Sequence, residues 1–539
     1  MTTAEPAKTV TVRIAAGYAT GGARVELGTV VHEGAVDPAA SIGIPLAMFN
    51  RHGLVAGATG TGKTKTLQLI AEQLSAAGVP VVMPDIKGDL TGLSAAATTN
   101  ERIAARVTDT GDAGWAGTAY PVEFLSVAGQ GSYVPIRATV DSFGPVLLSK
   151  VLDLNDTQES TLGLIFHWAD EKALPLLDLK DLRSVISHLT SDEGKDDLKE
   201  LGGVSKATAG VILRALTNLE ADGGDVFFGE PELAVTDLLR TDTDGRGIVS
   251  LIDSRGVQTR PALFSTFLMW LLSELFEELP EAGDLDKPKL VFLFDEAHLL
   301  FADASKAFRT AVEQTVKLIR SKGVGVFFCT QLPTDVPAAV LSQLGARVQH
   351  ALRAFTPQDQ KALATAVRTY PVTKDYDLQS ALTSLGTGEA IITVLSETGA
   401  PTPVAWTRVR APRSLMGPAP DDSVRAAVAA SALHARYSQA LDRTSAYEML
   451  TARLAPAPAP TTGGPYQPPP IAYPVPVPTT DLWPDQPVPA PTPAPAGGDG
   501  GFLSDLAGNP AVNAFWKSLG TAVGGSLGRS IFGTRRRRR

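Results

Sequence analysis

The residues best suited to chemistry lie in one glycine-rich stretch. The segment GATGTGKT, from Gly57 to Thr64, fits the pattern G-x-x-x-x-G-K-[ST] and stands between an apolar run, HGLVAG, and a helix-like run, TKTLQLIAEQLSAAG. Glycines let such a loop curl so that backbone N–H groups point at phosphate oxygens, and the helix that follows adds the positive end of its dipole. The segment therefore predicts a loop that binds nucleotide phosphates; its alternative is a glycine-rich turn without a ligand.

The positions of this loop have expected roles. Lys63 would reach the β- and γ-phosphates and Thr64 would bind Mg²⁺, so ATP and Mg²⁺ are the expected cofactors. Because every required position is filled in the right order, the ligand-binding interpretation is favoured. The expected nucleotide-binding residues are Gly57, Thr59, Gly60, Thr61, Gly62, Lys63, Thr64 and Lys65.

A pair of carboxylates supplies the second half of a hydrolysis site. The run KLVFLFDEAHLLF reads as an apolar strand followed by Asp295 and Glu296. Asp295 is expected to hold the Mg²⁺, and Glu296 to orient and deprotonate the attacking water. An acidic pair at a strand end can instead cap a helix, but beside a phosphate-binding loop the two motifs supply complementary halves of one reaction.

A third run, VGVFFCTQLP, places Thr330 and Gln331 where another strand ends. An amide there can hydrogen-bond the γ-phosphate or its water and report hydrolysis to the next element, so Gln331 joins the catalytic candidates. Its alternative is a turn residue that satisfies backbone groups. Cys329, the single cysteine, lies one step earlier, and we expect a small core residue there and not a nucleophile.

These motifs need strands that end at one edge of a sheet. The runs VPVVMPD, KLVFLFD and VGVFFCT are rich in β-branched or aromatic residues, and helical patterns separate them. Such alternation is typical of a parallel sheet covered on both faces. The predicted fold class is α/β: a P-loop NTPase sheet with helices on both faces and a mainly helical insertion, followed by a Pro-rich linker and a short tail.

The chain is long enough for several domains. Its 539 residues have an ordinary composition, 44% hydrophobic and 19% charged. Residues 455–501 differ sharply, because they hold sixteen of the 39 prolines and no Lys or Arg, which indicates a disordered, extended linker. The expected parts are a short N-terminal β segment at 1–45, core at 46–140, the helical insertion at 141–245, core again at 246–412, a helical extension at 413–454, the linker at 455–501, and an amphipathic segment with a polyarginine end at 502–539.

Charge and hydropathy bear on location and partners. The first residues lack the basic start and apolar core of a secretion signal, and the longest apolar stretch, which begins at Ala262, is too short and interrupted to cross a bilayer. We expect a buried core helix there and a cytoplasmic protein. The formal net charge is −9 although five arginines end the chain, so any contact with nucleic acid must come from a local patch.

The last residues suit several kinds of contact. Apolar residues recur at helical spacing from Val512 to Leu527, weakened by glycines, and the arginines from Arg535 to Arg539 follow. An amphipathic segment with a basic end can lie on a membrane surface as a peripheral anchor, dock in the groove of a protein partner, or hold nucleic acid. The alternative is a helix that packs on the body beside a solvated arginine run.

Several segments carry a family resemblance. The runs IPLAMFNRHGLVAGATGTGKT, DEAHLL, IRSKGVGVFFCTQLPTDVP and QLGARVQHALRAFTPQDQKAL resemble the FtsK/HerA superfamily of ring-forming P-loop motors, and MPDIKGDLTGLS is similar to a segment of its HerA-like proteins of the YjgR type. The resemblance covers Ile44 to Arg410. It implies a RecA/HerA-like core, a homo-hexameric ring and DNA as the polymer on which the ring acts.

The resemblance also implies that an arginine of a neighbouring subunit completes each ATP site by neutralising charge in the transition state. Arg347 and Arg353 are the candidates, with Arg347 favoured by its motif position and Arg320 as a third choice. An arginine in this stretch can equally hold a surface ion pair.

The region before the loop limits what the resemblance carries over. HerA proteins that resemble this chain have a complete β-barrel ahead of the motor, which docks the nuclease NurA, whereas about fifty residues precede the loop here. Two or three strands can form there, so the sequence gives a NurA-type partner no support.

The string from Asp295 to His298 also spells D-E-A-H, as in DEAH-box RNA helicases, but no second RecA-like half with an arginine-rich motif follows it.

Two functional hypotheses remain. The leading one is an ATP-driven translocase or helicase-like motor on DNA. The other is an ATP-dependent assembly or scaffold protein that organises a protein or membrane partner through its linker and basic tail. A weaker third, a motor that pumps protein through a secretion machine, would be expected to carry transmembrane helices. ATP turnover that DNA stimulates would separate the first hypothesis from the others.

Overall fold

The computed structural model describes residues 7–454, apart from short gaps at 128–131, 198, 200–201, 256–260, 284 and 302–305. The chain divides into two units, Met1–Leu450 and Thr451–Arg539, and the first contains the fold described below. The expected linker at 455–501 and the expected tail at 502–539 lie outside the described residues.

One sheet organises the first unit. Among the described residues its strands lie in the order β2-β1-β12-β11-β10-β3-β9-β8-β4-β7-β5-β6. All neighbours from β10 to β6 run parallel, so their carboxyl ends meet at one edge. These strands are β3 (Gly53–Ala56), β4 (Val81–Asp85), β5 (Val122–Val127), β6 (Val134–Ile136), β7 (Val249–Asp253), β8 (Leu290–Phe294), β9 (Val324–Thr330) and β10 (Ala346–Gln349).

The central parallel strands are buried apolar runs. Every residue of β8 and β9 is buried, as apolar runs of this kind require when helices cover both faces of a sheet. The three strands predicted from the sequence are present as β4, β8 and β9. Cys329 lies in β9 and is fully buried, which agrees with a core role.

The other end of the sheet is antiparallel. It consists of β1 (Arg24–His32), β2 (Ala35–Pro45), β11 (Glu389–Thr393) and β12 (Ala405–Val409). Glu33 and Gly34 turn β1 into β2 with φ values of 50° and 78°, as expected for a two-residue hairpin turn with positive φ at both positions. Residues 24–45 extend the sheet at this end, with β2 as its edge strand. Helix α1 (Ala7–Ala16) packs against this hairpin.

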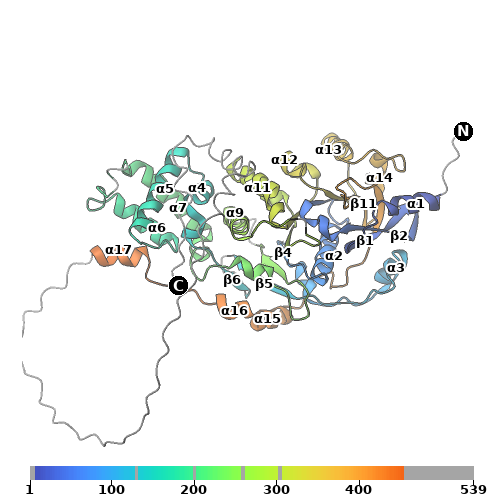
Figure 1. The fold of residues 1–539 in the computed structure, drawn as a ribbon, viewed down its shortest axis with the longest axis horizontal. Coiled ribbons are helices and arrows are strands. Elements are labelled where there is room, and N and C mark those ends of the chain that lie inside the picture. The colour runs from blue at the N-terminus through green and yellow to red at the C-terminus, as the bar shows by residue number, and fades with distance from the viewer. Residues whose placement is uncertain are drawn as a thin grey trace, which may run out of the picture. The chain divides into compact units, whose positions relative to one another are not determined.

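Helices cover both faces of the sheet (Figure 1). On one side lie α2 (Lys63–Ala76), α3 (Glu101–Asp109), α15 (Asp421–Ala430) and α16 (Ala432–Tyr437). On the other side lie α11 (Lys306–Leu318), α12 (Ala338–Leu341), α13 (Pro357–Val367) and α14 (Leu378–Ser384). Helix α9 (Pro261–Glu278) packs against α11.

The segment between β6 and β7 is mainly helical and lies beyond the parallel end of the sheet (Figure 1). It contains α4 (Val140–Val151), α5 (Asp156–Glu171), α6 (Leu179–Leu189), α7 (Lys206–Leu219) and α8 (Asp225–Phe227). Side chains at Asn155 and Asp178 cap α5 and α6 through reciprocal hydrogen bonds with Gln158 and Asp181. None of the helices in the described part of the chain is long and apolar enough to cross a membrane.

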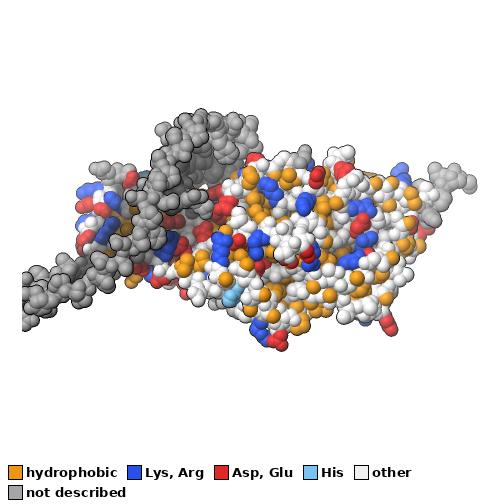
Figure 2. All heavy atoms as spheres, turned by 60° about the horizontal axis from the view of Figure 1, so that its bottom comes forward, with side chains coloured by type: hydrophobic (Ala, Val, Ile, Leu, Met, Phe, Trp, Pro, Cys, Tyr) orange, Lys and Arg blue, Asp and Glu red, His pale blue; other side chains and the backbone are white. Residues whose placement is uncertain are grey.

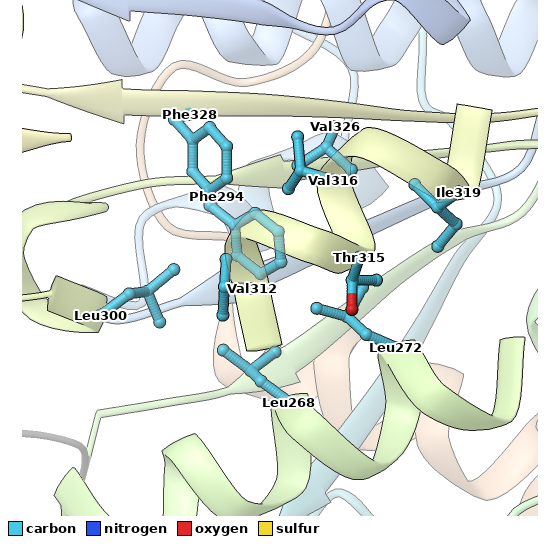
Figure 3. Close-up of a pocket in the computed structure, with 10 residues that line it drawn as sticks. All are labelled: Leu268, Leu272, Phe294, Leu300, Val312, Thr315, Val316, Ile319, Val326 and Phe328. Carbon is cyan, nitrogen blue, oxygen red and sulfur yellow. The ribbon is translucent and has the colours of Figure 1, made fainter. Parts of the chain in front are cut away.

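A small cavity between α9, α11, β8 and β9 belongs to the core. Figure 3 shows the side chains that line it, among them Leu268, Phe294 and Val316. Its volume is about 10 Å³, at the lower limit for a single water molecule. It is a packing gap and not a ligand site.

Candidate nucleotide-binding and hydrolysis site

The glycine-rich loop joins β3 to α2 at the carboxyl edge of the parallel strands. β3 ends at Ala56 and α2 begins at Lys63. Gly57, Gly60 and Gly62 have φ values of 150°, 79° and 114°, which residues with a Cβ rarely adopt. The glycines thus permit the tight curl that a phosphate-binding loop requires.

Backbone hydrogen bonds fix this loop to its neighbours. The N–H of Gly57 donates to the carbonyl of Thr330 at 3.2 Å, and the N–H of Ala58 donates to the carbonyl of Ala351 at 2.8 Å. The carbonyl of Thr61 accepts from the N–H of Gly388 at 2.9 Å. Thr330 ends β9, Ala351 follows β10 and Gly388 precedes β11. Hydrogen bonds to residues at the ends of three strands thus fix the shape of the loop.

The loop lysine and threonine connect the two motifs predicted from the sequence. Lys63 is only 7% exposed, and its Nζ donates to the carbonyl of Ala58 across the loop at 3.1 Å. The Thr64 hydroxyl donates to Oδ2 of Asp295 at 3.1 Å. Asp295 directly follows β8, so the structure brings the glycine-rich loop and the carboxylate pair together at one edge of the sheet.

The oxygen ligands at this edge fit Mg²⁺. Thr64 and Asp295 offer one hydroxyl and one carboxylate, and in the described part of the chain no three His, Cys, Asp or Glu side chains form a metal-binding group. Mg²⁺ is commonly bound through one or two carboxylates together with substrate phosphates and water. The site is therefore suited to a magnesium ion that arrives with a nucleotide and not to a permanently caged metal.

Glu296 combines a strained backbone with a buried, unpaired acceptor. Its φ is +50°, an uncommon value for a residue with a side chain and one that is often found at functional sites. The residue is 9% exposed, and its Oε1 accepts a hydrogen bond from Lys87 Nζ at 2.5 Å. Its Oε2 is buried, has no hydrogen-bond partner among the described residues, and lies 3.3 Å from His298 Nδ1. An oxygen left without a partner beside the magnesium ligands is suited to accept a proton from water.

Lys87 is a site residue that sequence reasoning missed. It lies in the loop after β4, within the segment MPDIKGDLTGLS, and its side chain is 50% exposed. Burial alone would lower the pKa of Lys87, but the hydrogen bond to Glu296 and the nearby carboxylates outweigh it and raise that pKa. Lys87 is therefore charged and holds Oε1 of Glu296, while Oε2 has no hydrogen-bond partner among the described residues. A lysine just after a predicted strand that ends in Asp was the available signal.

Asp85 stabilises the loop that carries Lys87 by accepting hydrogen bonds from its backbone. Its two oxygens accept from the N–H groups of Gly88 at 2.7 Å and Leu90 at 3.2 Å. Burial raises the pKa of Asp85 to about 6, and the nearby Asp89 adds to the shift. The hydrogen bonds to backbone fix the loop from Asp85 to Leu90 and with it the position of Lys87.

His350 is a second residue that the sequence did not reveal. It follows β10, is fully buried, and its Nε2 lies 2.9 Å from the Thr66 hydroxyl of α2. Its Nδ1 lies 2.8 Å from the carbonyl of Glu389, an acceptor, so Nδ1 carries the proton and Nε2 accepts from Thr66. Burial lowers the pKa of His350 to about 4, and a neutral imidazole therefore locks α2 to the strands beside the loop.

The remaining loop candidates and Gln331 fall at the same edge. Thr59 is exposed, and Thr61 is buried with its hydroxyl on the carbonyl of Ala58. Lys65 is engaged elsewhere, because its Nζ lies 3.1 Å from Gln68 Oε1 and 3.6 Å from an oxygen of Asp89. Gln331 directly follows β9 and is exposed. Its place agrees with a sensor role, which stays a prediction.

The two arginine candidates lie at opposite edges of the sheet. Arg347 is the second residue of β10 and pairs in register with Leu54 of β3, and its Nη2 donates to the carbonyl of Leu341 at 3.3 Å. Arg353 is exposed and lies two residues beyond Ala351, which accepts the hydrogen bond from the loop. The structure thus places Arg353, and not Arg347, at the edge of its own nucleotide loop.

The surface gives no dominant basic patch on the face seen in Figure 2. Lys and Arg side chains alternate there with Asp and Glu, as the acidic net charge of −9 suggests. A polymer with phosphates would therefore meet only local groups of cations on that face.

A curled glycine loop between strand and helix, facing carboxylates at the end of a nearby parallel strand, defines a P-loop nucleoside triphosphatase. Comparison with protein families identifies the chain more closely. It belongs to the family described as helicase HerA-like C-terminal, whose model matches residues 31–539. The family confirms the predicted HerA-like assignment, the α/β P-loop fold class and the prediction of an ATPase, for which ATP with Mg²⁺ is the cofactor pair.

The chain also has weak similarity to several solved structures. The bacterial conjugative coupling protein TrwBdeltaN70 in an unbound form is 14% identical, covers 76% of this chain and 94% of its own, and has a TM-score of 0.48. The plasmid coupling protein TrwB in complex with ADP and Mg²⁺ is 15% identical, with coverage of 74% and 98% and a TM-score of 0.47. VirB4 of Thermoanaerobacter pseudethanolicus is 14% identical, with coverage of 76% and 100% and a TM-score of 0.46. No curated protein matches the chain.

Proposed function

We propose that the protein is an ATP-hydrolysing ring motor that translocates on DNA. The observation that carries the proposal is the contact between Thr64 and Asp295 at the carboxyl edge, in a chain that belongs to the helicase HerA-like family. This contact joins a phosphate-binding loop to the carboxylates that hydrolysis needs.

Each residue of the site has a distinct task in hydrolysis. Lys63 and the loop N–H groups bind the β- and γ-phosphates. Thr64 and Asp295 would hold Mg²⁺, which offsets phosphate charge when bound. Glu296 takes a proton from water through its unpaired Oε2 while the water oxygen bonds to the γ-phosphorus and the bond to ADP breaks. Gln331 senses the γ-phosphate or the water and passes the change to the next element.

The proposed ring supplies the last charged group. In a homo-hexamer a neighbour's arginine would approach each γ-phosphate, and Arg347 remains the candidate favoured by its motif position. Its place away from its own loop is compatible with action on a neighbouring subunit. Arg353, exposed near its own loop, is the second candidate.

Steady-state ATP hydrolysis tests the proposal. We would measure turnover of the full chain without DNA, with single-stranded DNA and with duplex DNA, each at low and moderate salt, with Glu296→Gln as the inactive control. The motor proposal predicts stimulation by DNA that weakens as salt rises, because phosphate contacts release counterions. Turnover that ignores DNA at every salt would refute it and favour a scaffold role for the linker and tail.

A further inference from the structure

A turn at residues 386–389, between α14 and β11, touches the glycine-rich loop, and we call it the 386–389 turn. Gly388 of this turn has a φ of +73° and donates its N–H to the carbonyl of Thr61 at 2.9 Å. The contact is close, because a Cβ at Gly62 would lie 3.3 Å from the Cα of Gly388. The turn therefore meets the loop at the two residues that precede Lys63.

The 386–389 turn also reaches the helix that follows the loop. The carbonyl of Glu389 accepts a hydrogen bond from Nδ1 of the buried His350 at 2.8 Å, and Nε2 of that ring lies 2.9 Å from the hydroxyl of Thr66 in α2. The turn is thus joined to the end of the loop by one route and to α2 by another. Its position helps to decide where the N–H groups at the end of the loop point.

One arginine side chain holds the 386–389 turn in place. Arg106 lies in α3, on the same side of the sheet as α2 (Figure 1). Its Nη1 donates to the carbonyls of Gly388 at 2.7 Å and Val409 at 3.1 Å, and its Nη2 donates to the carbonyl of Thr387 at 2.9 Å. Because a guanidinium group presents its N–H donors in a planar, fixed fork, these three acceptors fix the turn relative to α3 and to Val409, which ends β12.

Arg106 bonds to carbonyls although carboxylates lie nearby. The carboxylates of Asp109 and Glu389 accept from Arg408 instead, at 2.9 and 3.0 Å. Burial lowers the pKa of Arg106, and the positive charge of Arg408 adds to the shift. Hydrogen bonds from a charged donor are stronger than those between neutral groups. The three carbonyls are therefore held firmly, and the guanidinium is not engaged in an ion pair that would compete with them.

We propose that Arg106 is a positioning residue for nucleotide binding, which acts through the 386–389 turn on Thr61 and Gly62 of the loop. A loop that already has its bound shape loses less freedom when the phosphates arrive, so its affinity for them is higher. Without Arg106 the loop would keep its glycines and Lys63 but lose the support of its last residues. The inference rests on the nucleotide-binding part of the proposed function and requires neither DNA nor a catalytic base.

Calorimetry of the full chain with Mg²⁺ and the non-hydrolysable ATP analogue ADPNP tests the proposal. We would compare Arg106→Met and Arg106→Lys with the matched control Arg137→Met. Arg137 is 9% exposed, donates from Nη1 to the carbonyl of Tyr437 at 2.9 Å, and follows β6, the edge strand at the parallel end of the sheet. The control therefore removes a buried contact between an arginine and a carbonyl without touching the turn. Urea unfolding of each variant without nucleotide measures the cost in stability.

We expect Arg106→Met to weaken ADPNP binding about tenfold. Arg106→Lys should weaken it less, because lysine keeps the charge but not the fork. Arg137→Met should leave the affinity unchanged although it lowers stability. Inorganic tripolyphosphate with Mg²⁺ should lose affinity in Arg106→Met by the same factor as ADPNP, because the loop contacts the phosphates.

Three results would overturn the proposal: unchanged affinity in both Arg106 variants, an equal loss of affinity in Arg137→Met, or a loss for ADPNP without one for tripolyphosphate. If Arg106→Met does not fold, Arg106→Lys decides in its place, with reduced affinity supporting the proposal and full affinity overturning it. Neither DNA nor hydrolysis enters these measurements, so failure of the motor proposal would leave the result interpretable.

Discussion

Replacing Gly57 by Ala tests how the glycine-rich loop is held. A Cβ at Gly57 would lie 2.6 Å from the Cβ of His350 and 3.1 Å from its Cα, and φ at Gly57 is +150°. His350 cannot retreat freely, because it is fully buried and its two ring nitrogens contact Thr66 and Glu389 at 2.9 and 2.8 Å. The substitution therefore forces either the loop or His350 to shift.

The expected cost has two parts, and Gly60 separates them. The backbone conformation costs about 1–3 kcal/mol for a residue with a Cβ, and the overlap with His350 adds about 1–3 kcal/mol. Gly60 has a φ of +79°, and a Cβ on it would meet nothing within 4 Å, so Gly60→Ala carries only the conformational cost, about 1–2 kcal/mol. Gly57→Ala should be the less stable variant by at least the overlap, about 1–3 kcal/mol.

Urea unfolding without nucleotide, in EDTA and at neutral pH, measures this difference. The fluorescence of Trp168 and Trp270, both buried, reports the transition of the first unit. Equal midpoints for Gly57→Ala and Gly60→Ala would refute the contact between the loop and His350. An earlier midpoint for Gly57→Ala, with the same slope against urea, is the predicted result.

Three further predictions follow from the site. Lys87→Met should lower ATP turnover about tenfold by releasing the base Glu296, with little change in ATP affinity and partial recovery in Lys87→Arg; unchanged turnover would remove Lys87 from the site. Because burial raises the folded-state pKa of Asp85 from 3.8 to about 6, its contribution to stability is full below pH 4 and is lost as pH rises through 6. Urea unfolding should show a loss of up to roughly 3 kcal/mol over that window, absent in Asp85→Asn; equal pH profiles would contradict this. Arg347→Ala should lower turnover but regain part of it when mixed with Glu296→Gln subunits; recovery with Arg353→Ala instead would make Arg353 the trans-acting residue.

Local patterns predicted much of the fold. The sequence from His52 to Gly78 contains strand, loop and helix signals in order, and the structure has β3, the loop and α2 there. The contact between Thr64 and Asp295 also follows from local signals, because Thr64 begins the helix that the loop joins to β3 and Asp295 follows β8, and the carboxyl ends of parallel strands share one edge. Apolar runs that end in polar residues thus carried enough information to bring the loop and the carboxylates together.

The features that sequence reasoning missed depend on distant pairings. Lys87 and Glu296 are 209 residues apart, and Thr66 and His350 are 284 apart. Neither pair has a spacing that a helix or strand period reveals. Strand order, which a single sequence does not encode locally, decides these contacts.

The N-terminal segment shows the same limit. The sequence predicted two or three strands in residues 1–45, beginning with the β-branched run at Thr9, and the structure has β1 and β2 there. The prediction was wrong for the first part of that stretch, because Ala7–Ala16 form helix α1, which packs on the hairpin. What the sequence did not indicate is that β1 pairs with β12, with Gly28 opposite Val409. The first and last strands of the body therefore lie side by side, and the hairpin extends the sheet.

Displacement of a third strand from duplex DNA tests the central claim most directly. A labelled triplex-forming oligonucleotide would be placed on a duplex, and its release followed with the full chain and ATP, with the full chain and ADP, and with Glu296→Gln and ATP. A translocating motor whose base is Glu296 predicts release only with the unaltered chain and ATP. Active ATP hydrolysis in the same tube without release, or equal release by Glu296→Gln, would contradict that account.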